Sequence, residues 1–317
     1  MSSYRREPAR ALRGSTVTVL LLAALAFATV PMEAAAQADH LIISEMAART
    51  RNPVSSFGSP FIEIVNPTGA TIDLTDVYLT DGATAPVAFY WHIVYADPAT
   101  QNPGGGNGGD FHARFPGGFS LAAGDTVVIS INGSAEFNEA YGYDPDFELF
   151  EDDLTPDAVP EMVEAFPGSI NAGTFGGDNV PALSEVAESL VLYTWDGASN
   201  LVQYIDYLMW GENTSVRINK SGVSVGGDTS LPDTPVGSQD PVAAAGPNFG
   251  LVFVRAGADE GTEVGVGGNG VTGHDETSET LSTTLAVIAD QTPGTGTSQP
   301  AAAAPIFTDG SFSPPAP

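Results

Sequence analysis

Residues 61–82, FIEIVNPTGATIDLTDVYLTDG, contain the pattern that decides the fold. The stretch opens on the β-rich run Phe61–Val65, in which successive side chains point to opposite faces. A turn follows at residues 66–69, where a proline fixes φ and a glycine allows positive φ. A second run, residues 72–80, leads into an Asp-Gly turn. Because proline and glycine interrupt any helix and β-branched residues are dense, the pattern predicts two antiparallel strands.

Five short motifs occur in a particular order in and around this stretch. They are a strand at residues 41–45 (LIISE), F-I-E-[LIV]-x-N at 61–66, L-x-x-x-x-L-x-D at 74–81, L-x-x-G-D at 121–125 and T-P-G at 292–294. In order and spacing they resemble the lamin-tail domain, a module of nuclear lamins that recurs in exported bacterial proteins. Members usually have Gly and an aromatic residue where this chain has Asp76 and Val77, a departure confined to one local turn.

The resemblance implies an all-β fold, an immunoglobulin-like antiparallel β-sandwich with loop and short-helix insertions, over residues 39–298. It also implies a non-enzymatic module for binding or for surface scaffolding, with an unidentified protein or surface polymer as partner. A shared fold does not fix an activity. The alternative is therefore a secreted metal-dependent hydrolase with its site in the inserted loops, and a third option is a periplasmic structural protein without a specific ligand.

The N-terminus predicts export. Arg5, Arg6, Arg10 and Arg13 precede an apolar run of fourteen residues, 17–30, and Ala36-Gln37-Ala38 is a small-x-small cleavage site. The apolar run is too short to span a bilayer comfortably. We therefore expect a signal peptide at residues 1–38, cleavage between Ala38 and Asp39, a secreted mature chain, and no membrane span in it.

The strong negative charge of the chain limits the classes of partner that it is expected to bind. The 317 residues carry a net charge of −29, and loss of residues 1–38, with four arginines and two glutamates, makes it −31. Such a charge repels phosphate backbones and anionic membrane surfaces, so we expect no nucleic-acid or membrane partner. The chain has no Cys, so a large hydrophobic core rather than disulfides must stabilise it.

Several further segments have a clear local pattern. The strongest is a hairpin, residues 189–195 and 201–210, joined by the loop DGASN. The remaining expectations are a strand at 87–95 (VAFYWHIVY), a flexible surface loop at 97–110, a short helix at 135–141 capped by Ser134, another short helix near 160–165, and a disordered low-complexity tail at 299–317.

One acidic run is a candidate for cation binding. Residues 144–157 hold seven carboxylates, and we take Asp144, Asp146, Asp152 and Asp153 as candidate ligands of a weak calcium site. No Gly occupies the sixth place, so the run is not an EF-hand loop, and a solvated acidic loop is the alternative.

The other signatures of catalysis are weak. The four histidines, His40, His92, His112 and His274, are scattered singly and form no H-E-x-x-H pair, so only a constellation from distant loops would bind zinc. Two G-x-G-x-x-G matches lie in glycine-rich loops outside any βαβ unit. We assign no catalytic residue and no organic cofactor.

Overall fold

The computed structural model describes a large part of the chain. The described residues are 38–48, 59–84, 88–95, 101–106, 109–151, 157–170, 181–247, 250–289 and 292–294, with short strands at 307–308 and 311–312. Apart from Ala38, the expected signal peptide lies outside them. Among these residues, no helix has the length and apolar character needed to cross a membrane.

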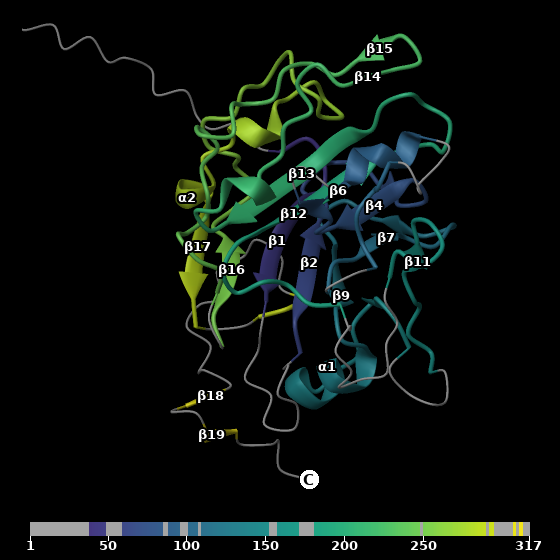
Figure 1. Ribbon diagram of the computed structural model, residues 1–317. Coiled ribbons are helices and arrows are strands. Elements are labelled where there is room, and N and C mark those ends of the chain that lie inside the picture. The colour runs from purple at the N-terminus through teal and green to yellow at the C-terminus, as the bar shows by residue number, and fades with distance from the viewer. Residues whose placement is uncertain are drawn as a thin grey trace, which may run out of the picture. The chain divides into compact units, whose positions relative to one another are not determined.

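Two β-sheets form the framework (Figure 1). The six-stranded sheet has the order β10-β9-β2-β1-β16-β17, and the five-stranded sheet has the order β11-β7-β4-β12-β13. Neighbouring strands are antiparallel except β9 and β10, which run parallel. In chain order the strands are β1 Ile42–Ala47, β2 Phe61–Val65, β4 Val77–Thr80, β7 His112–Arg114, β9 Thr126–Ser130, β10 Phe147–Glu148, β11 Val163–Glu164, β12 Glu188–Thr194, β13 Gln203–Trp210, β16 Val252–Arg255 and β17 Leu285–Ile288.

Short elements fill the connections between these strands. Four pairs of two-residue strands are β3 Ile72–Asp73 with β8 Ser120–Leu121, β5 Ala83–Thr84 with β6 Ala88–Phe89, β14 Ser224–Val225 with β15 Asp228–Thr229, and β18 Phe307–Thr308 with β19 Ser311–Phe312. The helices are α1 Ser134–Tyr141 and α2 Leu281–Thr284, with 3₁₀ turns η1 Tyr90–Val94, η2 Thr214–Val216 and η3 Glu276–Ser278. The expected all-β antiparallel sandwich with loop and short-helix insertions is thus confirmed.

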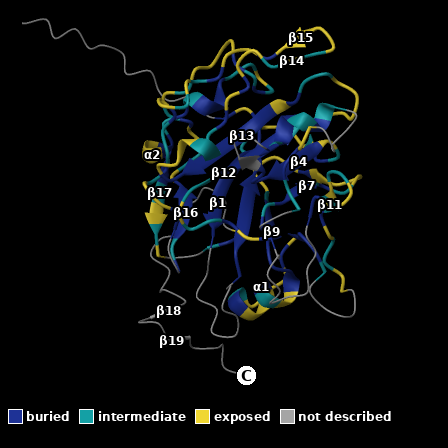
Figure 2. Cartoon of the chain, in the orientation of Figure 1, coloured by how far each residue is buried: buried dark blue, intermediate teal, exposed yellow. Residues whose placement is uncertain are grey.

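The β2 strand illustrates how both faces of a central strand become buried. Ile62 and Ile64 point into the core between the sheets, in one hydrophobic cluster with Leu192 of β12. On the opposite face, Phe61 packs edge-to-face against Phe137 of α1, with ring centroids 6.1 Å apart. All five residues of β2 are therefore buried, as the dark strands at the centre of Figure 2 show.

Two of the local expectations are wrong. In VAFYWHIVY only Ala88–Phe89 is a strand, and Tyr90–Val94 forms the 3₁₀ turn η1. The Tyr90 ring packs against Tyr193 at 5.0 Å, so these aromatic residues are selected for burial rather than for extended backbone. Near residues 160–165, the strand β11 takes the place of the expected helix because it pairs with β7 at the sheet edge.

The helix after residue 133 and the glycine-rich loop also differ in detail from expectation. The N-cap of α1 is Gly133, and the Ser134 hydroxyl donates to Asp157 at 2.6 Å instead of capping the helix. In the glycine-rich loop expected to be a flexible surface segment, Gly104 is buried against Gly82. In the expected C-terminal tail, only the β18–β19 pair belongs to the described residues, so its disorder stays a prediction.

Candidate metal centre

Ionisable side chains gather where β1, β13 and β16 meet the loop that follows β16. We call this group the buried acidic cluster; its members are His40, Asp206, Arg255, Glu260, Glu263, His274, Glu276 and Glu279. The two β-strand members are Asp206 on β13 and Arg255 at the end of β16, and η3 begins with Glu276. All members except Glu263 and His274 are at most 4% exposed. Five carboxylates thus share a largely buried region with one guanidinium and two imidazoles.

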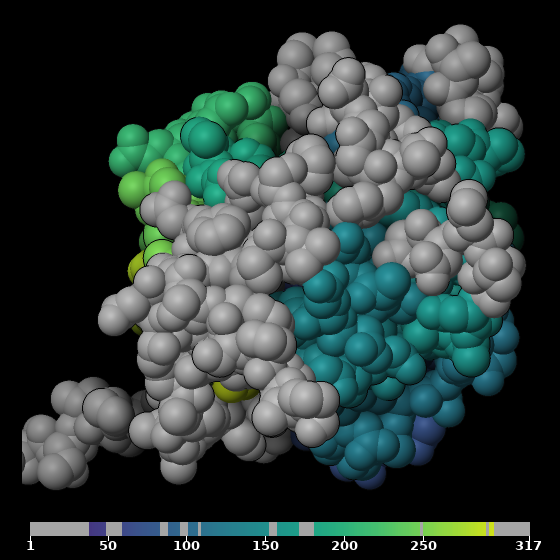
Figure 3. All heavy atoms as spheres, turned by 90° about the horizontal axis from the view of Figure 1, so that it is seen from below, coloured from purple at the N-terminus to yellow at the C-terminus, as the bar shows by residue number. Residues whose placement is uncertain are grey.

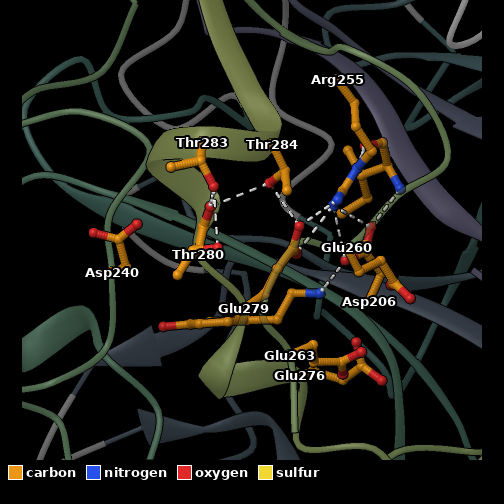
Figure 4. Close-up of polar contacts among 12 residues, drawn as sticks. Asp206, Asp240, Arg255, Glu260, Glu263, Glu276, Glu279, Thr280, Thr283 and Thr284 are labelled. Carbon is orange, nitrogen blue, oxygen red and sulfur yellow. Dashed lines mark hydrogen bonds and ion pairs between the residues drawn. The ribbon is translucent and has the colours of Figure 1, made fainter. Parts of the chain in front are cut away.

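The Arg255 half of the cluster is fully paired. Its Nη1 donates to Glu279 Oε1 at 2.5 Å, and its Nη2 lies 3.3 Å from Asp206 Oδ1 (Figure 4). Its Nε donates to the Ile43 carbonyl at 3.2 Å, while Asp206 Oδ2 accepts from the Ile43 amide at 2.5 Å. The planar guanidinium therefore bonds two carboxylates at once and connects β13 of one sheet to β1 of the other.

The His40 ring directs a nitrogen lone pair or a proton at the other carboxylates. Its Nδ1 lies 2.9 Å from the Leu41 carbonyl, which can only accept, so Nδ1 carries a hydrogen. The remaining nitrogen, Nε2, lies 3.3 Å from Glu260 Oε1 and 3.8 Å from Glu276 Oε1. A backbone carbonyl that holds the far nitrogen of a histidine is the usual arrangement around a metal-binding imidazole.

In this half of the cluster, one oxygen on each of three carboxylates has no hydrogen-bond donor among the described residues. Glu260 Oε1, Glu263 Oε1, Glu276 Oε1 and His40 Nε2 are buried atoms that have no hydrogen-bond partner. Figure 4 shows Glu263 and Glu276 side by side below Glu279, and Glu260 closer to Arg255 and Asp206. Burial and the neighbouring carboxylates raise the pKa of Glu263 to about 8 and the pKa of Glu276 well above its ordinary value. Burial alone would lower the pKa of His40, but Glu260 raises it to about 9.

The second histidine joins the same group. His274 Nδ1 lies 2.9 Å from Glu263 Oε2, and the His274 and His40 rings meet edge-to-face with centroids 5.8 Å apart. Ligand atoms within 4.8 Å of one another occur in three overlapping sets: His40 with Glu260 and Glu276, Glu260 with Glu263 and His274, and Asp39 with both histidines.

This arrangement has two chemical solutions. Either protons occupy the carboxylates and His40, or a divalent cation occupies the space between the unpaired oxygens and the imidazole nitrogens. Uncompensated buried carboxylates are costly, so one of the two is required. The five residues that would hold a cation are His40, Glu260, Glu263, His274 and Glu276.

The calcium candidates from the acidic run lie elsewhere. Asp144 and Asp146 are exposed, and each has a local partner: Asn138 donates to Asp144 at 2.6 Å and the Val128 amide to Asp146 at 2.9 Å. Asp152 and Asp153 lie outside the described residues. The acidic run belongs to the middle of the chain, and atoms from the middle of the chain, drawn in teal, cover a continuous area of the face in Figure 3.

The same run nevertheless contains a close set of carboxylates. Glu148, Glu151 and Asp157 each place an oxygen within 4.8 Å of the others. Glu148 is fully buried, and its Oε1 has no hydrogen-bond partner in the part of the chain that the structure describes. Burial raises the pKa of Glu148 to about 7. A calcium site in this run stays a prediction, with these three residues as its nearest geometric equivalent.

Sequence reasoning did not find the buried acidic cluster. Glu260, Glu263 and Glu276 lie in the segment 257–279, which has the composition of a glycine-rich acidic loop. The only available signal was the presence of a histidine, His274, within that loop and another, His40, beside the first strand. Their proximity depends on contacts between residues more than two hundred positions apart, which spacing in the sequence does not encode.

Comparisons with known proteins add little to this geometry. No family model and no curated protein match the chain. Among solved structures, it is similar to the crystal structure of a DUF4876 family protein from Bacteroides thetaiotaomicron, at 17% identity and a TM-score of 0.45. The match covers 83% of this chain and 75% of that one. A likeness at this level carries no information about function.

Proposed function

We propose that this protein is a secreted, non-enzymatic β-sandwich module of the lamin-tail type, used for binding or extracellular scaffolding, and that a structural divalent cation stabilises it. The observation that supports a structural rather than a catalytic cation is the burial of three members of the buried acidic cluster. His40, Glu260 and Glu276 are 3%, 4% and 1% exposed. A catalytic metal keeps a coordination position open to substrate, whereas a structural metal is enclosed by its ligands.

The donor types favour a particular class of cation. Imidazole nitrogen suits zinc and other transition metals, while calcium takes oxygen ligands almost exclusively. With His40 and His274 beside three carboxylates, Zn²⁺ or Mn²⁺ fits this cluster better than Ca²⁺. The cation would replace the protons that the pKa shifts of Glu263 and Glu276 otherwise demand.

The binding role rests on the lamin-tail resemblance and on the export signal. One sheet edge is a suitable recognition surface: β17 has a single described neighbour, β16, and Val287 on it is 43% exposed. An unpaired strand edge offers backbone donors and acceptors to an extended segment of a partner. The partner would be a protein or a surface polymer without strong negative charge, because the chain itself is strongly acidic.

The cation is tested on the mature chain, residues 39–317, after treatment with a chelator. The melting temperature is measured at high, fixed ionic strength with Zn²⁺, Mn²⁺ or Ca²⁺, and bound metal is counted by mass spectrometry. We expect the protein to bind one equivalent of Zn²⁺ or Mn²⁺ and to melt at a higher temperature. At a free metal concentration one hundred times Kd, the metal should add about 2.7 kcal/mol to the free energy of unfolding. E276Q should lose the response, and E212Q, at an exposed glutamate, should keep it.

The readout is the shift caused by metal, because E276Q also removes a buried charge and can raise the stability of the metal-free chain. An equal metal response in E276Q and E212Q would overturn the proposed centre. A hydrolytic activity of the metal-loaded chain that E276Q abolishes would overturn the non-enzymatic assignment and favour the hydrolase. For the binding role, the immobilised folded chain should retain a specific component of the cell envelope or medium. Retention equal to that of the chemically unfolded chain would favour a structural protein without a ligand.

A further inference from the structure

A second group of carboxylates converges at one end of the five-stranded sheet. Asp81 follows the last residue of β4, Asp110 precedes β7 by two positions, and Glu188 is the first residue of β12. Because β4 lies between β7 and β12 and is antiparallel to both, the end of β4 and the starts of β7 and β12 lie at the same end of the sheet. Their carboxylate oxygens lie within 4.8 Å of one another.

This carboxylate group has an unsatisfied oxygen at its centre. Asp81 is 2% exposed; its Oδ1 accepts from the Phe111 amide at 2.6 Å, but its Oδ2 has no hydrogen-bond partner among the described residues. Glu188 Oε2 accepts from the Ser184 amide at 2.5 Å. Within the described part of the chain, no Lys, Arg or His forms an ion pair with any of the three. Burial and mutual repulsion raise the pKa of Asp81 and of Glu188, the latter to about 8.

The backbone around these carboxylates is held in place by glycines. Gly104 has φ +76°, and a Cβ there would lie 2.4 Å from the Gly82 carbonyl oxygen. A Cβ on Gly105 would lie 2.7 Å from the backbone nitrogen of His112. The segment 102–106 therefore packs backbone-to-backbone against the turn that carries Asp81. This close approach leaves no room for a side chain at either glycine and keeps the turn fixed.

We propose that Asp81, Asp110 and Glu188 bind one Ca²⁺ ion, in a site that shares no residue with the buried acidic cluster. All donors are hard oxygens, which is the ligand type that calcium takes, and calcium accepts six to eight of them in flexible geometry, including carbonyls and water. The ion removes the repulsion among three carboxylates that lack a basic partner. It also links the glycine-rich segment and the start of β12 to the end of β4.

The test uses Ca²⁺ alone as the probe on the full mature chain, at high and constant sodium chloride so that general charge screening is already complete. Isothermal titration calorimetry and thermal melts are run on the chelator-treated protein. For wild type we expect one calcium site with a dissociation constant of about 10⁻⁴–10⁻³ M, as in extracellular calcium-binding modules. D81N and E188Q should each weaken calcium binding at least tenfold. D125N, at an exposed aspartate, serves as the matched control and should bind like wild type.

Two further arms keep the result interpretable. D110N changes the half-buried member of the set, so it remains informative if D81N does not fold. E276Q, which disables the other cluster, should leave calcium binding intact, and this separates the two sites. Equal calcium affinity in D110N and D125N, no calcium response in wild type, or an equal response to Mg²⁺ would each overturn the proposal.

Discussion

Glu45 and Glu63 face each other across β1 and β2, and both are fully buried. Each carboxylate binds the T-P-G segment: Glu45 accepts from the Thr292 amide at 2.8 Å and from the Thr292 hydroxyl at 3.0 Å, and Glu63 accepts from the Gly294 amide at 2.5 Å. Ser44 donates to Glu63 at 2.5 Å. The glutamate of the F-I-E motif thus helps fasten a segment more than two hundred residues away.

The Glu45 carboxyl predicts a pH dependence of stability. Burial raises the pKa of Glu45 to about 8, and the charge of Glu63 adds to this shift, which the Thr292 hydrogen bonds oppose. Between about pH 4.5 and 8 the folded chain therefore holds a proton that the unfolded chain releases. The stability contributed by that proton is complete below this window and is lost as the pH rises through it.

The measurement is the free energy of unfolding in urea at several pH values for wild type and E45Q. Since the amide side chain of the E45Q variant does not titrate, the difference between the two proteins should change by about 1.4 kcal/mol for each pH unit inside the window. E212Q corrects for the general loss of one surface charge. Parallel pH curves for wild type and E45Q would show that Glu45 titrates at its ordinary pKa in the folded chain.

Thr292 should contribute measurably through its hydroxyl. T292V keeps the shape and the backbone amide but removes the bond to Glu45 Oε2. Because the folded Glu45 carboxyl holds a proton below about pH 8, this bond joins two neutral groups at neutral pH. Such a bond contributes about 0.5–1.5 kcal/mol, and we expect a loss in this range in urea unfolding at pH 7. T126V makes the same chemical change at a half-buried position on β9, away from this contact, and should change stability little. An equal effect of both substitutions would show that the T-P-G contact does not stabilise the fold.

Ile64 tests the burial of β2. This side chain is fully buried and belongs to the core cluster between the sheets. I64D places an unpaired charge there and should cost more than about 4 kcal/mol or prevent folding. I64V removes one methylene group and should cost about 0.5–1.5 kcal/mol. Circular dichroism and urea melts compare them, and an I64D protein as stable as I64V would contradict this packing.

The sequence predicts the framework well where local pattern and tertiary environment agree. The hairpin of β12 and β13 follows from two apolar, aromatic-rich runs on either side of a five-residue loop that contains Gly197. The prediction of a strand at residues 87–95 is wrong because aromatic residues are enriched in strands through their burial. A buried 3₁₀ turn buries them equally well. Pairing of β11 with β7 is likewise a long-range event that its own residues do not specify.

The candidate sites were much less predictable than the framework. In a chain with 39 acidic residues, a carboxylate carries no signal until its burial and its neighbours are known. Asp81 lies in the motif that indicates the fold. Its proposed role as a calcium ligand, however, depends on its proximity to Asp110 and Glu188, which lie at the starts of two other strands. Sequence spacing directed attention to residues 144–157, where density along the chain is high but Asp144 and Asp146 remain solvated.

The acidic run can be tested separately from both proposed sites. If residues 144–157 bind calcium, the change of Asp152 and Asp153 to Asn should reduce the thermal shift that millimolar calcium causes at saturating sodium chloride. E148Q should reduce it too, because Glu148 has a buried oxygen that lacks a hydrogen-bond partner. D81N provides the background in which the other oxygen-only site is disabled. An unchanged shift in these variants would identify the run as a solvated acidic loop.

The ion pairs of Arg255 should contribute strongly to the stability of the fold. Its guanidinium bonds Asp206, Glu279 and the Ile43 carbonyl at once, without exposure to solvent. R255M keeps much of the side-chain volume but leaves two buried carboxylates without a counter-charge, and removing one partner of a buried pair costs about 3–5 kcal/mol. R255K keeps the charge, yet a single ammonium cannot span both carboxylates in the same plane. We therefore expect R255K to fall between wild type and R255M.

The matched control for that series is R114K on β7, a half-buried arginine, which should stay within about 0.5 kcal/mol of wild type in urea unfolding. A second arm adds D206N and E279Q to R255M, so that no charge remains buried without a partner. This triple variant should recover part of the loss, because the penalty in R255M comes mainly from the uncompensated carboxylates rather than from lost attraction. If R255K unfolds at the same urea concentration as wild type, charge alone and not the guanidinium geometry joins β13 to β1 and β16. If R255M does so, the connection between the sheets depends instead on the bond between Asp206 and the Ile43 amide.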